Sequence, residues 1–338
     1  MSATTPVCQL IERQADACRQ FNDYRGWLWV APPSDPWLTA QAPGPLWSAD
    51  LTLVRQWRAV GLTAYDSLEP EIATPPGAVL FWPKAHALGE WWLLALCRGL
   101  PAGTPLQIVG ENQGGIKRVL KVLAALGLGC RKLDSARRCT LFETRVGPLA
   151  LDPDALWQRF EAAGLTLASH PGVFGHGKLD DGTRLLLEHL PHELGRHGER
   201  VLDVGCGDGV IAASLAQRGA AVTALDVSAF AVEATRRTLA ANALQGTVVQ
   251  SDVYDGLADD GRFSAIVSNP PFHQERAIDY GPAARLIAEA PERLERGGSL
   301  LLVANAFLPY PDRLEAAFGR FSILADDRRF RVYRAIRR

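Results

Sequence analysis

The tetrapeptide Asn269-Pro270-Pro271-Phe272 has residue types that could act on an aromatic amine. Such a nitrogen is a poor nucleophile because its lone pair is delocalised into the ring. The side-chain oxygen of Asn269 and the backbone carbonyl of Pro270 are two acceptors that could hold the two N–H bonds and localise this lone pair. The prolines stiffen the loop, and the ring of Phe272 can stack on a base. We therefore assign Asn269, Pro270 and Phe272 to catalysis, and Pro271 and His273 to substrate binding.

The position of this tetrapeptide favours a functional role. It follows the strand-like run 263–268, and ligands of a parallel sheet bind at the carboxyl ends of its strands. The alternative is a rigid turn with a core aromatic, and His273 could be an ordinary solvated loop residue. The tetrapeptide resembles the N-P-P-[FYW] signature of methyltransferases that act on amino groups.

A glycine-rich loop earlier in the chain is the candidate cofactor site. The run 203–209, Asp-Val-Gly-Cys-Gly-Asp-Gly, lies between an apolar segment and the helical pattern 210–217. Glycines allow a ligand to approach the backbone at a helix N-terminus. The spacing G-x-G-x-G differs from the dinucleotide fingerprint G-x-G-x-x-G and looks like an S-adenosylmethionine loop. The residues assigned to the cofactor are Asp203, Gly205, Gly207 and Gly209.

Two later acids strengthen the cofactor assignment. Asp226 ends the second strand-like run, where a carboxylate can accept both hydroxyls of a ribose. Asp252 follows the third run and could accept from an adenine amino group, with the amide of Val253 beside it. A helix cap for Asp226 and a turn residue for Asp252 are the alternatives. The glycine loop, Asp226 and Asp252 follow three successive strand-like runs, and together they predict S-adenosyl-L-methionine as the cofactor.

Strand-like runs alternate with helical patterns through the second half of the chain, which is typical of a doubly wound parallel sheet. The last two runs are separated by a short polar turn, so we expect them to pair antiparallel. Seven strands with a terminal hairpin resemble the class I methyltransferase fold. The predicted strands are 201–204, 221–226, 247–250, 263–268, 299–304, 321–325 and 329–336.

The first half contains a weaker echo of the cofactor loop. The run 106–116 reads like a copy of 201–211, with Gly110 at the position of Gly205. Asn112 stands in place of a glycine and would obstruct a cofactor. We therefore predict an α/β protein of two tandem class I (Rossmann-like, seven-stranded) methyltransferase folds, the first degenerate. The predicted domains are 1–163, for substrate recognition, and 164–338, which is catalytic and binds S-adenosylmethionine.

Composition limits the remaining possibilities. The chain has 338 residues and a formal net charge of −1, which argues against binding naked nucleic acid through bulk charge. Neither a long apolar run nor a signal peptide is evident, so we expect a cytoplasmic protein with no membrane partner. The six cysteines lack C-x-x-C spacing, so no metal site is predicted.

Longer stretches of the sequence resemble one bacterial family, the guanine-N(2) methyltransferases of 16S ribosomal RNA. The matching segments are 201–209, 268–273 and 303–312. The resemblance implies methyl transfer to the 2-amino group of guanine 1207 of 16S rRNA, in the small ribosomal subunit. Apart from the resemblance, we expect a monomer. Asn305 and Phe307 would complete the base pocket, with capping or core roles as alternatives. The run Gly-His-Gly-Lys at 175–178 departs from the family's Ser-Arg-Asp-like stretch.

Three other functions remain open from the sequence. The paralogous enzymes methylate a guanine of 23S rRNA. Release-factor methyltransferases act on a glutamine amide and share the Asn-Pro-Pro motif, but they carry tyrosine where this chain has Phe272. A catalytically silent RNA-binding scaffold is the third possibility, against which the intact glycines and Asn269 argue for the second half.

Overall fold

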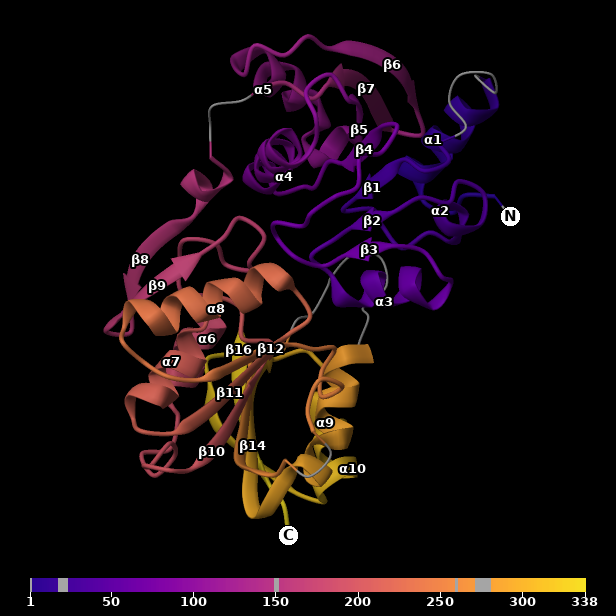
Figure 1. The fold of residues 1–338 in the computed structure, drawn as a ribbon. Coiled ribbons are helices and arrows are strands. Elements are labelled where there is room, and N and C mark those ends of the chain that lie inside the picture. Colours follow the sequence, from indigo (N-terminus) through magenta and orange to yellow (C-terminus); the bar gives the residue numbers. More distant parts are fainter. Residues whose placement is uncertain (1, 18–23, 149–151, 259–260, 271–280) are drawn as a thin grey trace. The chain divides into compact units, whose positions relative to one another are not determined.

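The computed structural model describes residues 2–17, 24–148, 152–258, 261–270 and 281–338. The chain divides into two compact units, Met1–Trp157 and Gln158–Arg338, and each is described by itself (Figure 1). The predicted boundary after residue 163 falls inside a hairpin formed by β8 (Gln158–Ala162) and β9 (Leu165–Ser169). This hairpin belongs to the second unit.

The second unit contains one seven-stranded sheet in the order β12-β11-β10-β13-β14-β16-β15. All seven predicted runs form strands, and the predicted antiparallel pairing of the last two is confirmed. The pairs from β12 to β14 are parallel. The strands are β10 (Arg200–Val204), β11 (Ala221–Asp226), β12 (Thr247–Gln250), β13 (Phe263–Ser268), β14 (Leu294–Asn305), β15 (Phe321–Asp326) and β16 (Phe330–Ile336).

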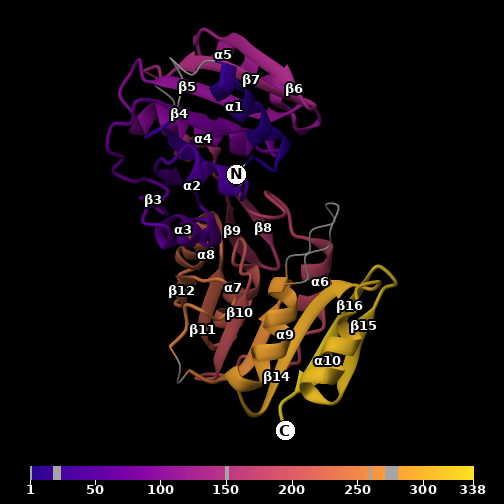
Figure 2. The same ribbon diagram turned by 90° about the vertical axis from the view of Figure 1, so that its right-hand side faces the viewer.

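Helices cover both faces of this sheet (Figure 2). Neighbouring strand residues alternate between two apolar clusters: Val201 packs into one and Leu202 into the other. Strands that are buried on both faces are mostly apolar, which is why these runs were recognisable in the sequence. One face carries α6 (Asp181–Glu188), α7 (Val210–Gln217) and α8 (Ala229–Ala241), and the other carries α9 (Gly281–Arg293) and α10 (Tyr310–Phe318).

The first unit repeats this architecture. Its sheet has the order β3-β2-β1-β4-β5-β7-β6, the same succession as in the second unit. The strands are β1 (Leu28–Val30), β2 (Leu46–Trp47), β3 (Ala64–Tyr65), β4 (Ala78–Phe81), β5 (Pro105–Glu111), β6 (Arg131–Ala136) and β7 (Cys139–Arg145). The α-helices are α1 (Pro6–Ala17), α2 (Pro36–Ala40), α3 (Leu51–Ala59), α4 (His86–Gly99) and α5 (Val119–Ala125).

The predicted match of Gly110 with Gly205 is wrong. Gly110 lies on β5, which pairs with β4 and β7 and therefore corresponds to β14. The strand that corresponds to β10 is β1. The two glycines look alike in sequence because each lies where a buried strand gives way to a turn. A short run of residues does not reveal a strand's place in the sheet.

Backbone pairing identifies the true counterpart of the cofactor loop. The amide of Ala31 donates to the carbonyl of Trp47 over 2.9 Å, as the amide of Gly205 donates to the carbonyl of Leu225 over 2.8 Å. Ala31 also keeps a positive φ of 49°. The loop of the first unit thus follows β1 and reads Ala-Pro-Pro-Ser-Asp, without a glycine.

Two further equivalences explain why the first unit is degenerate. Ser48 takes the place of Asp226, since in both units an oxygen at this position accepts from the amide two residues later. Phe81 occupies the position of Asn269 in the strand register. Leu80, just before Phe81, pairs with Val30 at the end of β1, as Ser268, just before Asn269, pairs with Val204 at the end of β10. The first unit therefore lacks the glycines, the carboxylate and the amide that the second unit has at these positions.

Candidate active site

The glycine loop has a backbone that only glycine adopts easily. Gly205, Gly207 and Gly209 have φ values of 77°, 57° and 83°. A Cβ on Gly209 would lie 2.9 Å from the Cα of Thr235, so α7 and α8 approach closely here. A Cβ on Gly207 would meet only Val173 Cγ1, at 3.9 Å. The loop therefore offers open space above Gly207, where a ligand can approach the backbone.

Substitution of Gly209 should destabilise the second unit. In Gly209→Ala the new Cβ adds left-handed strain and a collision with backbone, so we expect a loss of about 2–4 kcal/mol, or roughly 5–15 °C in Tm. Gly319→Ala is the matched control, because Gly319 also has positive φ but no atom within 4 Å of the added Cβ. Calorimetric unfolding would measure both. Equal losses in the two variants would show that the close approach of Thr235 is unimportant.

Asp226 holds this loop from the end of β11. Its Oδ2 accepts from the amide of Gly207 over 3.1 Å, and its Oδ1 accepts from the amide of Ser228 over 2.9 Å. Each carboxylate oxygen can accept more than one hydrogen bond. The structure thus brings Asp226 to the predicted cofactor loop, and its role toward a ribose stays a prediction.

Asp203 is fully buried under the loop. Its Oδ2 accepts from the amide of Ala212 over 3.0 Å, whereas its Oδ1 has no hydrogen-bond partner among the described residues. Burial raises the pKa of this carboxyl to about 8, and the negative charges of Asp226 and Asp208 add to the effect. The open space above Gly207 is the feature that fits a cofactor, and the role of Asp203 toward that cofactor stays a prediction.

The pH dependence of stability should report Asp203. An unfolded carboxyl has a pKa of about 3.9, so the folded state binds this proton more tightly. Its contribution to stability therefore falls as the pH rises from about 4 to about 8. Asp203→Asn cannot titrate at this position, so it does not show this loss. The Tm of the variant should therefore rise relative to that of the wild type as the pH increases from about 4 to about 8. Scanning calorimetry without cofactor measures it. A difference that is constant with pH contradicts the prediction.

Asp252 and Val253 lie after β12. The Oδ2 of Asp252 accepts from Arg285 Nη1 of α9 over 2.9 Å, and Arg285 also pairs with Asp255. Asp252 is thus held by a salt bridge that the sequence did not predict. Val253 is buried and has a positive φ of 52°. Their roles toward an adenine stay predictions.

Asn269 follows β13 and is held through its amide nitrogen. Its Nδ2 donates to Asp180 Oδ2 over 3.1 Å and to Thr183 Oγ1 over 2.8 Å. Both acceptors lie at the start of α6, where Asp180 is the N-cap. Because the nitrogen is engaged on this side, the oxygen is the atom available to a substrate. Sequence reasoning did not assign either acceptor to the site, although Asp180 precedes a helical pattern as N-caps do.

The structure describes only some of the other residues that were assigned to catalysis or substrate binding. Pro270 is buried directly after Asn269, whereas Pro271, Phe272 and His273 lie outside the described residues. Asn305 ends β14, the strand beside β13, and is buried; its Nδ2 has no hydrogen-bond partner among the described residues. Phe307 lies two residues after Asn305, and its side chain is 63% exposed.

The segment before α6 packs on the cofactor loop. His170 stacks on Phe230 of α8, with ring centroids 4.1 Å apart and planes 9° apart. Burial lowers the pKa of His170 to about 3, so the ring is neutral at physiological pH. A Cβ on Gly172 would lie 2.4 Å from Phe230, so this turn requires glycine. The turn then presents Val173 to Gly207.

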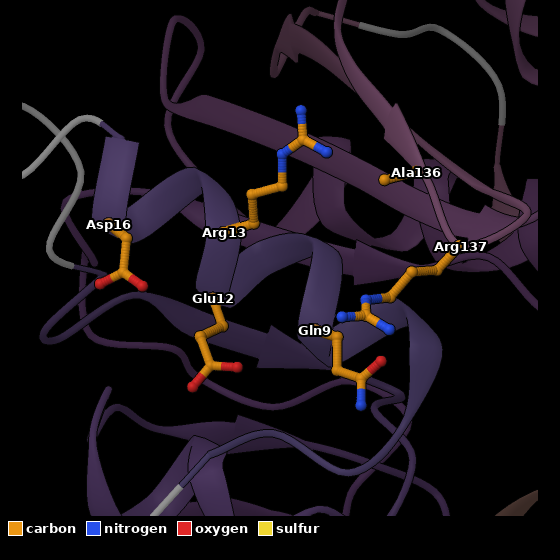
Figure 3. A pocket seen from close by; sticks show the side chains of 6 residues that line it. All are labelled: Gln9, Glu12, Arg13, Asp16, Ala136 and Arg137. Atoms are coloured by element: carbon orange, nitrogen blue, oxygen red, sulfur yellow. The ribbon is translucent and has the colours of Figure 1, made fainter.

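A pocket in the first unit is a weaker candidate (Figure 3). Its charged side chains are two acids and two arginines, so it lacks the excess positive charge that phosphate binding requires. The lining residues are Gln9, Glu12, Arg13, Asp16, Ala136 and Arg137. Within the described residues there is no metal-ligand cluster of three or more His, Cys, Asp or Glu, and no helix long and apolar enough to span a membrane.

Comparisons with known proteins identify the family. A family model described as "Methyltransferase small domain" matches residues 164–334, and "Methyltransferase small domain N-terminal" matches residues 58–160. A ribosomal RNA small subunit methyltransferase C from Chromohalobacter salexigens is 67% identical over 339 residues, covering 100% of this chain and 99% of that protein. One from Pseudomonas aeruginosa is 46% identical over 305 residues, covering 88% and 90%.

A solved structure agrees with these sequence relatives. The T. thermophilus 16S rRNA N2 guanine(1207) methyltransferase, in complex with AdoMet and guanosine, matches with a TM-score of 0.85 and 29% identity. The match covers 99% of this chain and 92% of that one. The chain therefore belongs to the methyltransferase small domain family, in the group of the ribosomal RNA small subunit methyltransferases C.

Proposed function

We propose that this protein transfers a methyl group from S-adenosyl-L-methionine to the exocyclic 2-amino group of guanine 1207 in 16S rRNA. The orientation of Asn269 carries the proposal: its amide nitrogen is held by α6, and its oxygen remains for a substrate at the carboxyl end of β13. The full-length relative at 67% identity and the T. thermophilus enzyme support the same substrate.

The residues of the site explain how an amine can be made reactive. When bound, the cofactor supplies an activated methyl on a positively charged sulfur. Asn269 Oδ1 and the carbonyl of Pro270 accept from the two N–H bonds of the guanine and localise its lone pair. Orientation of the reacting atoms can supply about 7–11 kcal/mol, so a strong general base is not required and the proton is lost to water. The guanine must leave its stack to reach this loop.

The first unit is proposed to recognise the substrate. It lacks the loop glycines, the carboxylate and the amide that the second unit has, yet it keeps the whole fold. The chain as a whole has a net charge of −1, so contacts to phosphates would depend on local groups of exposed cations in this unit. These cations are Lys117, Arg118, Lys121, Arg131, Lys132, Arg137 and Arg138.

We further propose that the protein is a cytoplasmic monomer and that it acts on 16S rRNA within the small ribosomal subunit. A metal has no role in it, because the methyl of a sulfonium is already activated. Sedimentation of the purified protein would test the monomer, and a dimer at working concentration would contradict it.

Transfer of labelled methyl tests the proposal directly. Small subunits that lack the modification, free 16S rRNA and large subunits would each be incubated with the protein and labelled S-adenosylmethionine. Label on small subunits, recovered as N(2)-methylguanine at position 1207, is expected. Label only on large subunits would move the assignment to 23S rRNA. Label on a release factor alone would replace it with amide methylation.

A further inference from the structure

The first turn of α6 reaches the predicted catalytic amide across a long stretch of sequence. Asp180 Oδ2 accepts from both the amide of Thr183, over 3.0 Å, and Nδ2 of Asn269, over 3.1 Å. Thr183 Oγ1 accepts from the same Nδ2 over 2.8 Å, and Thr183 is only 7% exposed. The two hydrogens of the Asn269 amide thus have two acceptors on one helix turn.

This arrangement distinguishes the two ends of the amide. Turned by 180°, Asn269 would place its oxygen against the Asp180 carboxylate and its N–H groups against the N–H groups of a guanine amine. We propose that Asp180 and Thr183 are positioning residues, which hold Asn269 with Oδ1 toward the substrate amine. They touch Asn269 and not the reacting atoms. The inference rests on the proposed function, because it concerns the orientation of the acceptor in that reaction.

The helix turn is itself fixed against the sheet. A Cβ on Gly182 would lie 3.2 Å from Phe330 Cδ1 of β16 and 3.1 Å from Asp180 Oδ2, so only a small residue allows this close approach. Asp181, next to the N-cap, pairs instead with Arg329 over 3.0 Å. The first turn of α6 therefore has little freedom to move away from Asn269.

The charge of Asp180 also affects Asp208, a residue of the predicted cofactor loop. Burial raises the pKa of Asp208, in the glycine loop, to about 6, and the charge of Asp180 contributes to this shift. A change at Asp180 could therefore alter cofactor binding as well as the orientation of Asn269. Thr183, which contributes only a hydroxyl, gives the cleaner test.

The main experiment compares Thr183→Val with Thr183→Ser. Valine keeps the shape but removes the acceptor, so kcat for methyl transfer should fall about 3- to 10-fold while KM for cofactor and RNA stays within about twofold. Serine keeps the hydroxyl and should restore kcat. Asp181→Asn is the control, because it removes a charge from the same turn without touching Asn269. A loss in Thr183→Ser equal to that in Thr183→Val would overturn the proposal.

A double-mutant cycle tests whether Thr183 acts through Asn269. In an Asn269→Ala background, Thr183→Val should cause no further loss of kcat, because the amide that it positions is gone. Losses that multiply would show an independent role and overturn the proposal. Asp180→Ser is a second variant: serine still caps α6, but its shorter side chain withdraws the acceptor from Asn269.

A measurement without substrate separates this inference from the proposed function. In ¹⁵N-labelled protein the side-chain amide signals of Asn269 are those that vanish in Asn269→Ala. Both should shift in Thr183→Val and in Asp180→Ser, and both should stay near their wild-type positions in Asp181→Asn. Unchanged signals in the first two variants would overturn the positioning role whatever the substrate. Shifted signals without methyl transfer to any RNA would support the positioning role and reject the proposed function.

Discussion

Asn269→Ala is expected to lower kcat for methyl transfer about 10²- to 10³-fold, the usual cost of removing one donor or acceptor that stabilises a transition state. Binding of S-adenosylmethionine should be unchanged, because the bonds of Asn269 run to α6 and not to the glycine loop. Single-turnover rates with the modified guanine as readout would measure the first effect, and calorimetric titration the second.

Two companion variants sharpen this result. Asn269→Asp keeps the acceptor oxygen but replaces the donating nitrogen with a second oxygen, which would lie against the carboxylate of Asp180, so this variant should be impaired as well. Asn242→Ala makes the same chemical change at the C-cap of α8, where Asn242 Nδ2 donates to the carbonyl of Thr166; it should lower Tm and leave kcat near wild type. If Asn269→Ala keeps kcat within about threefold, the acceptor role of Asn269 is wrong.

Asp226→Ala is expected to raise the Kd for S-adenosylmethionine by roughly 100-fold or more. The substitution removes the acceptors for the amides of Gly207 and Ser228, and with them the carboxylate that we predict to accept from the two ribose hydroxyls. Hydrogen bonds to a charged group contribute about 1.5–3 kcal/mol each, and 1.4 kcal/mol is tenfold in affinity. Titration of the cofactor into each variant would measure the change.

The internal duplication provides the control for this variant. Ser48 occupies the position of Asp226 in the first unit and likewise accepts from the amide two residues later. Ser48→Ala should therefore leave the affinity for S-adenosylmethionine unchanged, because the first unit has no glycine loop beside it. An affinity loss in Ser48→Ala, or none in Asp226→Ala, would mean that the cofactor is not held where we predict.

The sequence determined most strands of the second unit, although β14 begins at Leu294, five residues before its predicted start. The inner strands of its sheet are largely buried and mostly apolar, so they stand out between turn residues, and β11, β12 and β13 match their predicted bounds. The glycine loop and the Asn-Pro-Pro-Phe motif were recognisable for a similar reason. Their spacing is set by contacts within a few residues, which a sequence displays directly.

Only the tertiary structure decided the features that depend on which strands are neighbours. The echo at Gly110 was assigned to the wrong strand, because the same local turn occurs at two places in a sheet whose order the sequence does not state. The start of the second unit at β8 was missed because this hairpin packs on α8, far along the chain. Asp180 and Thr183 likewise meet Asn269 only after α6 folds against the sheet. Short sequence patterns indicate the residues of a local motif. Contacts between segments that are distant in the sequence depend on the order of the strands in the sheet, which only the folded structure shows.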